Sequence, residues 1–362
     1  MVRVDLSDYG YVNARVRGMR AHLLTKDFFT RLVETENFEA LHSTLEQTVY
    51  RREISEAILV NPDRPDYDQA LNVNLVASLK KILDATGGEP RRLVSLLYTR
   101  YDLQNVKTIF RGKKGNATPG EIINTLVPVG NLSMAELEPI AREREIHGIL
   151  ELMQALSIKY AKPLAKAFPE YLKHDKDLSV LELALDRFHY EDAMRQLKGR
   201  DRNTDMVRQM FIAEIDKHNI STLVRIRGIR LDDEEVQDLR IPGGTLSPEQ
   251  FLELDRLGDI VRIVGEYPDP VYRKVLEKAL YEYQEMDVVA FDRELEHELL
   301  KEGAGMSNVD VLGIGVTIGY MWSKYNEIIN LRVVLKGKMI EQPQAEIMKN
   351  LFFVEPAASK AA

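Results

Sequence analysis

The feature that most constrains the fold is a helical motif that occurs three times at nearly equal intervals. Each copy places an acidic residue three positions before an asparagine. The three pairs are Asp102 and Asn105, Asp216 and Asn219, and Glu327 and Asn330. The asparagines at 105, 219 and 330 are 114 and then 111 residues apart, a unit far longer than the roughly 20 to 50 residues of solenoid repeats. We therefore predict three homologous helical domains rather than a stacked array.

The agreement between the copies extends beyond this pair. Aliphatic residues follow each asparagine at one and four positions, and a cation follows at six positions. The cations are Arg111, Arg225 and Lys336. A glutamate and a β-branched residue lie sixteen and seventeen positions downstream in every copy, as Glu121-Ile122, Glu235-Val236 and Glu346-Ile347. Three copies that share all of these positions favour a repeated domain over chance similarity.

The segments after the motif indicate how the copies are connected. The first two copies are followed by Gly-x-Leu-Ser, at 130–133 and 244–247, in which the serine suits a helix N-cap. The third copy ends before this point, but Leu24-Thr25 near the N-terminus has the same order of leucine and hydroxyl residue. We therefore expect circular closure, in which the N-terminal helices complete the third domain and the two termini lie close together.

The apolar residues predict an all-α protein. They recur at steps of three and four residues, as in Tyr9, Val12, Val16 and Met19, and alternation with a period of two is scarce. Proline and glycine interrupt this pattern at 61–65, 241–244 and 267–270, where we expect helices to stop.

One face of the motif helix should be buried. At about 100° per residue, the positions nine, eight and four before the asparagine and one, four and five after it share this face, and the acid and the asparagine lie within it. A functional interpretation makes the carboxylates general bases or metal ligands, although no nucleophile or histidine accompanies them in the sequence. We favour a structural interpretation, in which each pair caps a neighbouring helix or joins a salt bridge, because buried polar groups must be satisfied.

Composition excludes several classes of protein. The chain of 362 residues has a net charge of −8 and no cysteine, so a basic nucleic-acid binder, disulfides and thiolate metal sites are not expected. No window approaches the roughly 18 to 20 apolar residues of a membrane span, and the first residues lack a signal pattern. The glycines at 313–319 lack the spacing of a dinucleotide loop, and no phosphate loop or paired-histidine zinc motif occurs. We expect no catalytic residue, metal or cofactor.

The N-terminal segment Tyr9 to Met19, with Leu23-Leu24, resembles the start of the C subunit of archaeal A-type and bacterial V-type rotary ATPases, a family that includes the d subunit of eukaryotic vacuolar ATPases. The similarity extends through 50–54, the three asparagine-centred windows and 351–353. It therefore covers almost the whole chain.

This resemblance implies a funnel-shaped protein with three similar domains around a pseudo-threefold axis. It also implies a non-catalytic central-stalk protein that links the rotor shaft, made of the D and F subunits, to the membrane proteolipid ring and transmits torque. Such a protein lies peripherally at the cytoplasmic face of the cell membrane, crosses no bilayer, binds no nucleic acid and is a monomer in isolation. The alternatives are a helical adaptor of another complex, or an enzyme whose site residues converge only in three dimensions.

The expected domains are the N-terminal helices over 1–54, the repeats over 55–145, 146–255 and 256–354, and a tail over 355–362. Three cations of the first helix, Arg15, Arg17 and Arg20, are candidate interface residues. Packing of this helix between domains would instead give at least one of them a structural role.

Overall fold

The computed structural model describes residues 8–62, 64–282 and 288–354, and every regular element within these ranges is helical. The prediction of an all-α fold is therefore confirmed. The predicted tail over 355–362 lies outside the described residues.

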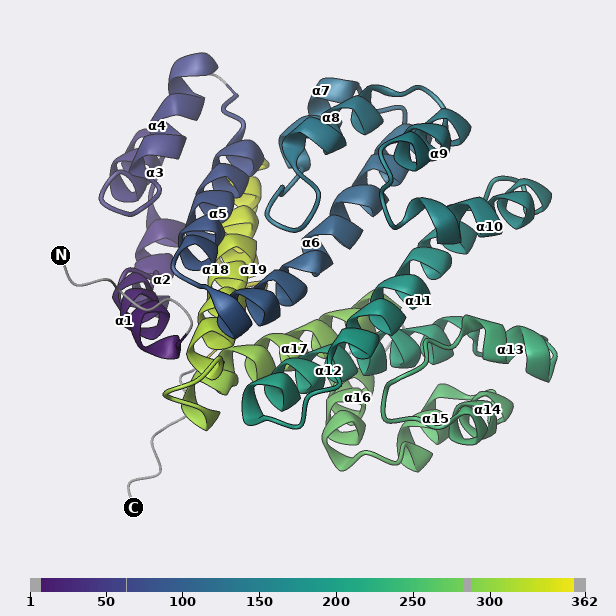
Figure 1. Cartoon of the computed structure of the whole chain (residues 1–362). Coiled ribbons are helices and arrows are strands. Elements are labelled where there is room, and N and C mark those ends of the chain that lie inside the picture. Colours follow the sequence, from purple (N-terminus) through teal and green to yellow (C-terminus); the bar gives the residue numbers. More distant parts are fainter. Residues whose placement is uncertain (1–7, 63, 283–287, 355–362) are drawn as a thin grey trace. The chain divides into compact units, whose positions relative to one another are not determined.

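The chain forms a series of helices joined by short loops (Figure 1). In chain order they are α1 (Tyr9–Arg20), α2 (Lys26–Glu34), α3 (Phe38–Leu45), α4 (Arg51–Val60), α5 (Tyr67–Asp84), α6 (Gly88–Lys114), α7 (Pro119–Thr125), α8 (Met134–Arg142), α9 (Ile146–Ala155), α10 (Ala161–Lys173), α11 (Leu178–Gln196), α12 (Arg202–Ile226), α13 (Asp233–Leu239), α14 (Pro248–Arg256), α15 (Ile260–Glu266), α16 (Pro270–Glu282), α17 (Val288–Val309), α18 (Gly315–Met339) and α19 (Gln344–Lys349).

The helices belong to two compact units. One comprises residues 1–178 and 304–362, and the other comprises residues 179–303. Within the first unit, α1 packs against α18, and α2 packs against both α18 and α19. These contacts bring together helices from opposite ends of the sequence, as the purple and yellow ribbons in Figure 1 show. They support the closure hypothesis.

The order of helix lengths repeats three times. A helix of 18, 19 or 22 residues (α5, α11, α17) precedes one of 27, 25 or 25 residues (α6, α12, α18). A helix of only 7, 7 or 6 residues (α7, α13, α19) follows. Three further helices complete each series, and in the third series these are α2, α3 and α4. This order favours repeats over 67–173, over 178–282, and over 288–349 together with 26–60. These bounds differ from the expected repeats over 55–145, 146–255 and 256–354. Both divisions of the chain are proposals.

Local capping explains the recurring spacing of the downstream glutamates. Thr118 and Glu121 form a capping box at the start of α7, and Asp232 and Glu235 form one at the start of α13. Each glutamate side chain accepts a hydrogen bond from the backbone N–H of the residue three positions before it, at 2.7 and 2.8 Å. Glu121 and Glu235 therefore determine where the short third helix of the repeat begins.

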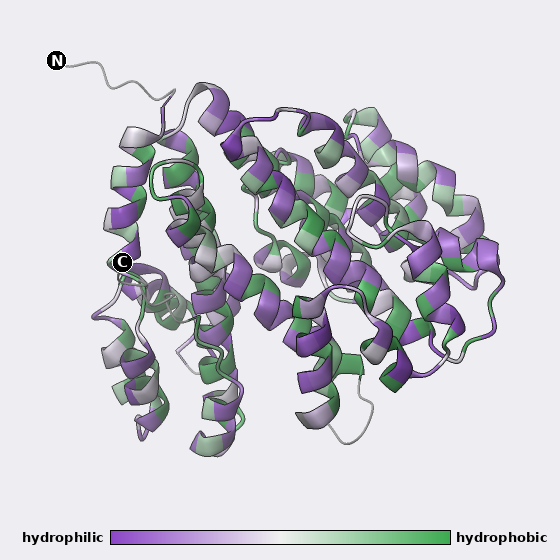
Figure 2. Cartoon of the chain, turned by 90° about the horizontal axis from the view of Figure 1, so that it is seen from below, coloured by the Kyte–Doolittle hydropathy of each residue, from purple (hydrophilic) through white to green (hydrophobic). Residues whose placement is uncertain are grey.

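The predicted apolar face of the motif helix is buried in all three copies. Its positions are at most 6% exposed. They are Leu96, Leu97, Tyr101, Val106, Ile109 and Phe110 in α6, Met210, Phe211, Ile215, Ile220, Leu223 and Val224 in α12, and Met321, Trp322, Asn326, Leu331, Val334 and Leu335 in α18. Figure 2 shows hydrophilic and hydrophobic residues interspersed along the helices. Among the described residues, none of the helices combines the length and the apolarity needed to cross a membrane.

Candidate functional site

The acid of the first copy binds the loop that leads into α8. Asp102 is fully buried, and its two carboxylate oxygens accept hydrogen bonds from the backbone N–H groups of Asn131 and Leu132 at 2.8 and 2.9 Å. A side chain at Gly130 would overlap this carboxylate. The glycine of the Gly-x-Leu-Ser segment is therefore required because the loop backbone approaches the acid so closely.

Asn105 binds a second loop segment of the same repeat. Its side-chain amide donates to the carbonyl of Val127 at 2.9 Å and its side-chain oxygen accepts from the N–H of Val127 at 2.8 Å. The amide thus pairs with both polar groups of one backbone residue, as a neighbouring strand would. Through this pair, α6 holds the loop between α7 and α8.

The second copy repeats this geometry within its own unit. Asp216 accepts hydrogen bonds from the backbone N–H of Thr245 at 2.7 Å and from its hydroxyl at 2.9 Å. Asn219 pairs with the carbonyl and the N–H of Ile241 at 2.9 and 2.8 Å. A side chain at Gly244 would again overlap the carboxylate.

The third copy uses the opposite end of the chain. Glu327 accepts a hydrogen bond from the backbone N–H of Leu24, the leucine that occupies the place of Leu132 in the first copy. Asn330 pairs with the carbonyl and the N–H of Phe352 at 2.7 and 3.1 Å. The asparagine therefore binds a residue 22 positions downstream in every copy. We call each acid–asparagine pair with its loop partners a node.

The third node also contains a buried cation. Lys324 is 1% exposed, and its ammonium donates to Glu327 at 2.9 Å and to the hydroxyl of Tyr50 at 2.7 Å. The Tyr50 hydroxyl in turn donates to Glu327 at 2.6 Å. Burial lowers the pKa of Lys324, and the neighbouring Glu327 opposes this shift. No local pattern predicts this cluster, because Tyr50 lies 277 residues before Glu327 and 274 residues before Lys324.

Tyr50 is one of three equivalent tyrosines. Tyr50, Tyr160 and Tyr267 all have no exposed surface and lie before the last helix of their repeat. Each follows the hydroxyl N-cap of its repeat (Thr25, Ser133 or Ser247) by 20 to 27 positions. This recurrence was the sequence signal that could have identified them.

Burial also shifts the carboxylates of the first two nodes. Desolvation raises the pKa of Asp216 to about 6, although hydrogen bonds from Thr245 oppose the shift. Desolvation likewise raises the pKa of Asp102, against hydrogen bonds from Leu132 and Asn131. These carboxylates are held by backbone and hydroxyl donors in a packed interior. No cluster of three metal-ligating side chains occurs in the part of the chain that the structure describes.

The candidate interface arginines lie along α1 and have different surroundings. Arg15 is exposed and contacts Tyr11 of its own helix, through a hydrogen bond of 3.0 Å. Arg17 donates to the carbonyl of Val311, and Arg20 donates to the hydroxyl of Ser307 at 2.9 Å. Arg17 and Arg20 therefore connect α1 to the segment around the α17–α18 turn. Arg15 is exposed like Arg17, but its hydrogen bond stays within α1.

Two cations of the motif join consecutive repeats. Lys336 of α18 pairs with Asp68 of α5 at 3.1 Å, and Arg225 of α12 pairs with Asp292 of α17 at 2.5 Å. Asp68 and Asp292 lie 37 and 38 residues before Asn105 and Asn330. Both acids thus lie on the first helix of a repeat, at nearly the same distance before the asparagine of that repeat.

Comparison with known proteins decides the family. The model of the ATP synthase (C/AC39) subunit family matches residues 12–350. This chain belongs to that family. The resemblance expected from the N-terminal segment and the three windows is confirmed.

Relatives within the ATP synthase (C/AC39) subunit family match over similar lengths. The C subunit of the A-type ATP synthase of Methanocaldococcus jannaschii is 26% identical over 96% of this chain and 87% of its own length. That of Methanococcoides burtonii is 28% identical over 95% of this chain and 94% of its own length. The C subunit of Pyrococcus abyssi is 25% identical over 91% of this chain and 86% of its own length. The similarity thus extends over nearly the whole of both chains.

Proposed function

We propose that this protein is the non-catalytic central-stalk subunit of an A/V-type ATP synthase. In this role it links the rotor shaft, made of the D and F subunits, to the membrane proteolipid ring and transmits torque between ATP chemistry and ion translocation. The observation that carries the proposal is the match of residues 12–350 to the ATP synthase (C/AC39) subunit family. Relatives that are named as the C subunit of A-type ATP synthases, and that match nearly the full length of this chain, support the same role.

The interior supports a mechanical role for the chain. A torque-transmitting protein needs domains that do not change shape under load. Each repeat fixes its loops to its longest helix through two buried polar side chains. Backbone groups satisfy them, together with the hydroxyl of Thr245 in the second node and with Lys324 and Tyr50 in the third. Fully satisfied polar networks in a packed interior are rigid, because any displacement leaves a buried group unpaired. In this proposal the nodes stabilise the domains and take no part in chemistry.

The proposal includes the arrangement of the repeats and the location of the protein. Three similar domains around a pseudo-threefold axis would form a funnel, closed by the N-terminal helices, with one rim for the shaft and one for the ring. The protein would lie at the cytoplasmic face of the cell membrane as a peripheral component and would be a monomer in isolation. Arg15 is a candidate contact in such an assembly because its side chain is exposed.

Reconstitution tests the proposal. The ATPase is assembled in vesicles with and without this protein, and ATP hydrolysis and ion transport are measured separately. We expect hydrolysis by the soluble catalytic head to persist without the protein, whereas ion transport coupled to it is lost. Undiminished coupled transport in its absence would contradict the central-stalk role. Copurification adds a second readout, since recovery with an unrelated complex instead of the shaft and the ring would favour the helical-adaptor alternative.

A further inference from the structure

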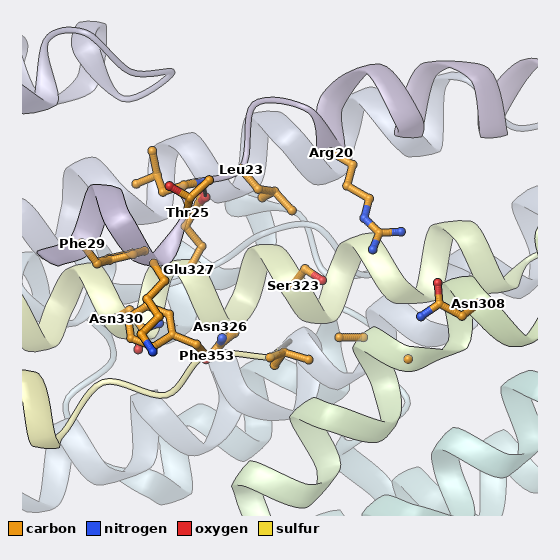
Figure 3. A pocket seen from close by; sticks show the side chains of 15 residues that line it. Arg20, Leu23, Thr25, Phe29, Asn308, Ser323, Asn326, Glu327, Asn330 and Phe353 are labelled. Carbon is orange, nitrogen blue, oxygen red and sulfur yellow. Dashed lines mark hydrogen bonds between the residues drawn. The ribbon is translucent and has the colours of Figure 1, made fainter. Parts of the chain in front are cut away.

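A pocket of about 340 Å³ lies beside the third node. It is bounded by the end of α1, the start of α2, the last turns of α17, the middle of α18 and the segment at 353–354. Figure 3 shows Arg20 and Asn308 at one end of the pocket, with Ser323 beside them and Asn326 near Phe353. Its volume is within the range of sites that bind small organic groups.

The pocket exists because the third repeat carries small side chains where the first carries tyrosines. Ser323 and Asn326 lie seven and four positions before Asn330, and Tyr98 and Tyr101 lie seven and four positions before Asn105. Both tyrosines are buried. The hydroxyl of Tyr98 reaches across to α5 and donates a hydrogen bond to the carbonyl of Leu79 at 3.1 Å. Repeat 1 therefore fills with its own side chains the space that repeat 3 leaves open.

One wall of the pocket carries a buried acceptor without a donor. Asn326 is 6% exposed, and its amide nitrogen donates to the carbonyl of Phe352 at 2.9 Å. Its amide oxygen is buried and has no hydrogen-bond partner among the described residues. A buried acceptor left unsatisfied is unfavourable, so the site favours a bound group that presents an N–H or O–H donor.

The opposite side of the pocket is cationic. Arg20 is half-buried and donates to Ser307, and it forms no ion pair with a carboxylate among the described residues. A guanidinium has five N–H donors in a planar fork that matches a carboxylate. The end of the pocket away from Arg20 carries the rings of Phe29 and Phe353, whose centroids are 5.7 Å apart (Figure 3). The lining also includes Lys26, Glu327 and Asn330.

We propose that this pocket binds the carboxyl-terminal residue of a polypeptide chain. Such a residue carries a carboxylate, an amide N–H and a side chain on adjacent atoms. The carboxylate would pair with Arg20, the N–H would donate to the oxygen of Asn326, and a large apolar side chain would contact Phe29 and Phe353. A free amino acid fits less well, because its ammonium would add a positive charge to a pocket that Arg20 and Lys26 already line. The carboxylate of Glu327 also lines the pocket, but it is already paired with Lys324. This inference is independent of the proposed rotor role.

Calorimetry with matched peptides tests the inference on the full chain. The probes are acetyl-Gly-Gly-Phe with a free carboxylate and the same peptide with a carboxamide terminus. We expect saturable binding of the carboxylate form, at least about tenfold tighter than the amide form, because only the carboxylate can form the bidentate pair with Arg20. Free phenylalanine should bind more weakly than the acetylated peptide.

Three variants locate the binding. Arg20→Gln should abolish the preference for the carboxylate form, whereas Arg15→Gln on the same helix, which does not line the pocket, should leave it unchanged. Ser323→Tyr restores the residue of repeat 1 and should fill the pocket and reduce binding at least about tenfold. If circular dichroism shows that Ser323→Tyr is unfolded, the comparison of Arg20→Gln with Arg15→Gln still decides whether the carboxylate binds in this pocket.

Several results would overturn the inference. Equal affinity for the carboxylate and amide peptides, or equal binding by Arg20→Gln and Arg15→Gln, would show that Arg20 does not recognise a terminus. Unchanged binding by folded Ser323→Tyr would place the site elsewhere. No saturable binding by either peptide would indicate a pocket filled by solvent, with water as the donor to Asn326.

Discussion

At the residue scale, each repeat buries a carboxylate and satisfies it with groups from a loop. Asp102 uses two backbone N–H groups, and Asp216 uses the N–H and the hydroxyl of Thr245. Glu327 has one backbone donor from Leu24, but it also binds Lys324 and Tyr50. In the third node the ammonium of Lys324 and the hydroxyl of Tyr50 therefore take the place of the second loop donor that the other two nodes have.

Removal of these acids should destabilise the fold. Asp102→Ala and Asp216→Ala leave buried donors unpaired, and we expect each to lower the free energy of unfolding by about 1 to 3 kcal/mol. Glu327→Ala also isolates the buried Lys324, so we expect a larger loss of about 3 to 5 kcal/mol. Chemical denaturation measures these changes, with Glu253→Ala outside the three nodes as the control.

A double variant separates the ion pair from the fold around it. Lys324→Met combined with Glu327→Gln removes both charges and should recover part of the stability lost in Glu327→Ala. If all three acid variants kept full thermal stability while the assembled ATPase lost coupling, the acids would be functional contacts and the structural interpretation would be wrong.

The raised pKa of Asp216 predicts a pH dependence of stability. Its pKa is about 6 in the folded chain against 3.8 for a free side chain, so the folded state holds this proton more tightly. Stability from this group is therefore greatest at low pH and falls as the pH rises from about 4 to about 6, by up to about 3 kcal/mol. Denaturation across this window should show the fall in the free energy of unfolding, and Asp216→Asn should reduce that fall.

Glu302 should contribute in the same way at higher pH. Burial raises the pKa of its side chain to about 7, so the free energy of unfolding should also fall as the pH rises towards 7. Glu302→Gln should reduce this second fall in the same denaturation series.

At the scale of elements, close helix packing requires glycine in two of the three copies. A side chain at Gly112 of α6 would lie 2.6 Å from Ile122 of α7, and one at Gly337 of α18 would lie 2.7 Å from Ile347 of α19. The second copy has no glycine here, with Ile226 at the glycine position and Val236, one methylene smaller, at the isoleucine position. Glycine is therefore required at this crossing only in the first and third copies.

Alanine at these glycines should be destabilising despite its higher helix propensity. We expect Gly112→Ala and Gly337→Ala to cost about 1 to 3 kcal/mol, because the new methyl group overlaps a buried isoleucine. Combining Gly112→Ala with Ile122→Val removes the terminal methyl group of the isoleucine and should recover part of this loss. Gly18→Ala is the control, since nothing lies within 4 Å of a side chain there, and it should be neutral or stabilising by up to about 1 kcal/mol. Thermal denaturation that ranked Gly112→Ala with Gly18→Ala would contradict the packing argument.

At the scale of the whole molecule, the third repeat depends on both ends of the chain. Leu24 and Tyr50 bind Glu327, and Asn13 donates to the carbonyl groups of Leu312 and Gly313 at 2.7 and 3.1 Å. The carbonyl of Thr35 accepts a hydrogen bond from Lys338 at 2.6 Å. The N-terminal helices therefore complete an interior that the C-terminal helices cannot form alone.

Deletion of residues 1–60 should expose this dependence. We expect the amides of α18 and α19 to lose protection in hydrogen exchange, because the shortened chain removes the packing of α1 and α2 against them. It also removes Leu24 and Tyr50, two of the hydrogen-bond partners of Glu327. The amides of α13 to α15 belong to the other compact unit and provide an internal control, with protection expected to persist. Unchanged protection of α18 and α19 would show that the third repeat is stable without the N-terminal helices.

The sequence by itself determined the helical class, the recurring motif and the buried face of the motif helix. These features depend on spacings within about thirty residues, such as the acid and the asparagine on one turn of helix or the glutamate that completes a capping box. Local geometry converts such spacings directly into positions on a helix surface. The burial of Leu96, Phe211 and Trp322 could therefore be predicted before any contact was known.

Only the tertiary structure decided which groups satisfy the buried acids and where space remains. Glu327 meets Leu24 and Tyr50 from the other end of the sequence, and Lys324 is buried because these partners surround it. The pocket beside Asn326 likewise depends on side chains from both ends of the chain. The spacing of residues within one helix does not reveal contacts of this kind, because they depend on how separate helices pack rather than on the rise and turn of any one of them.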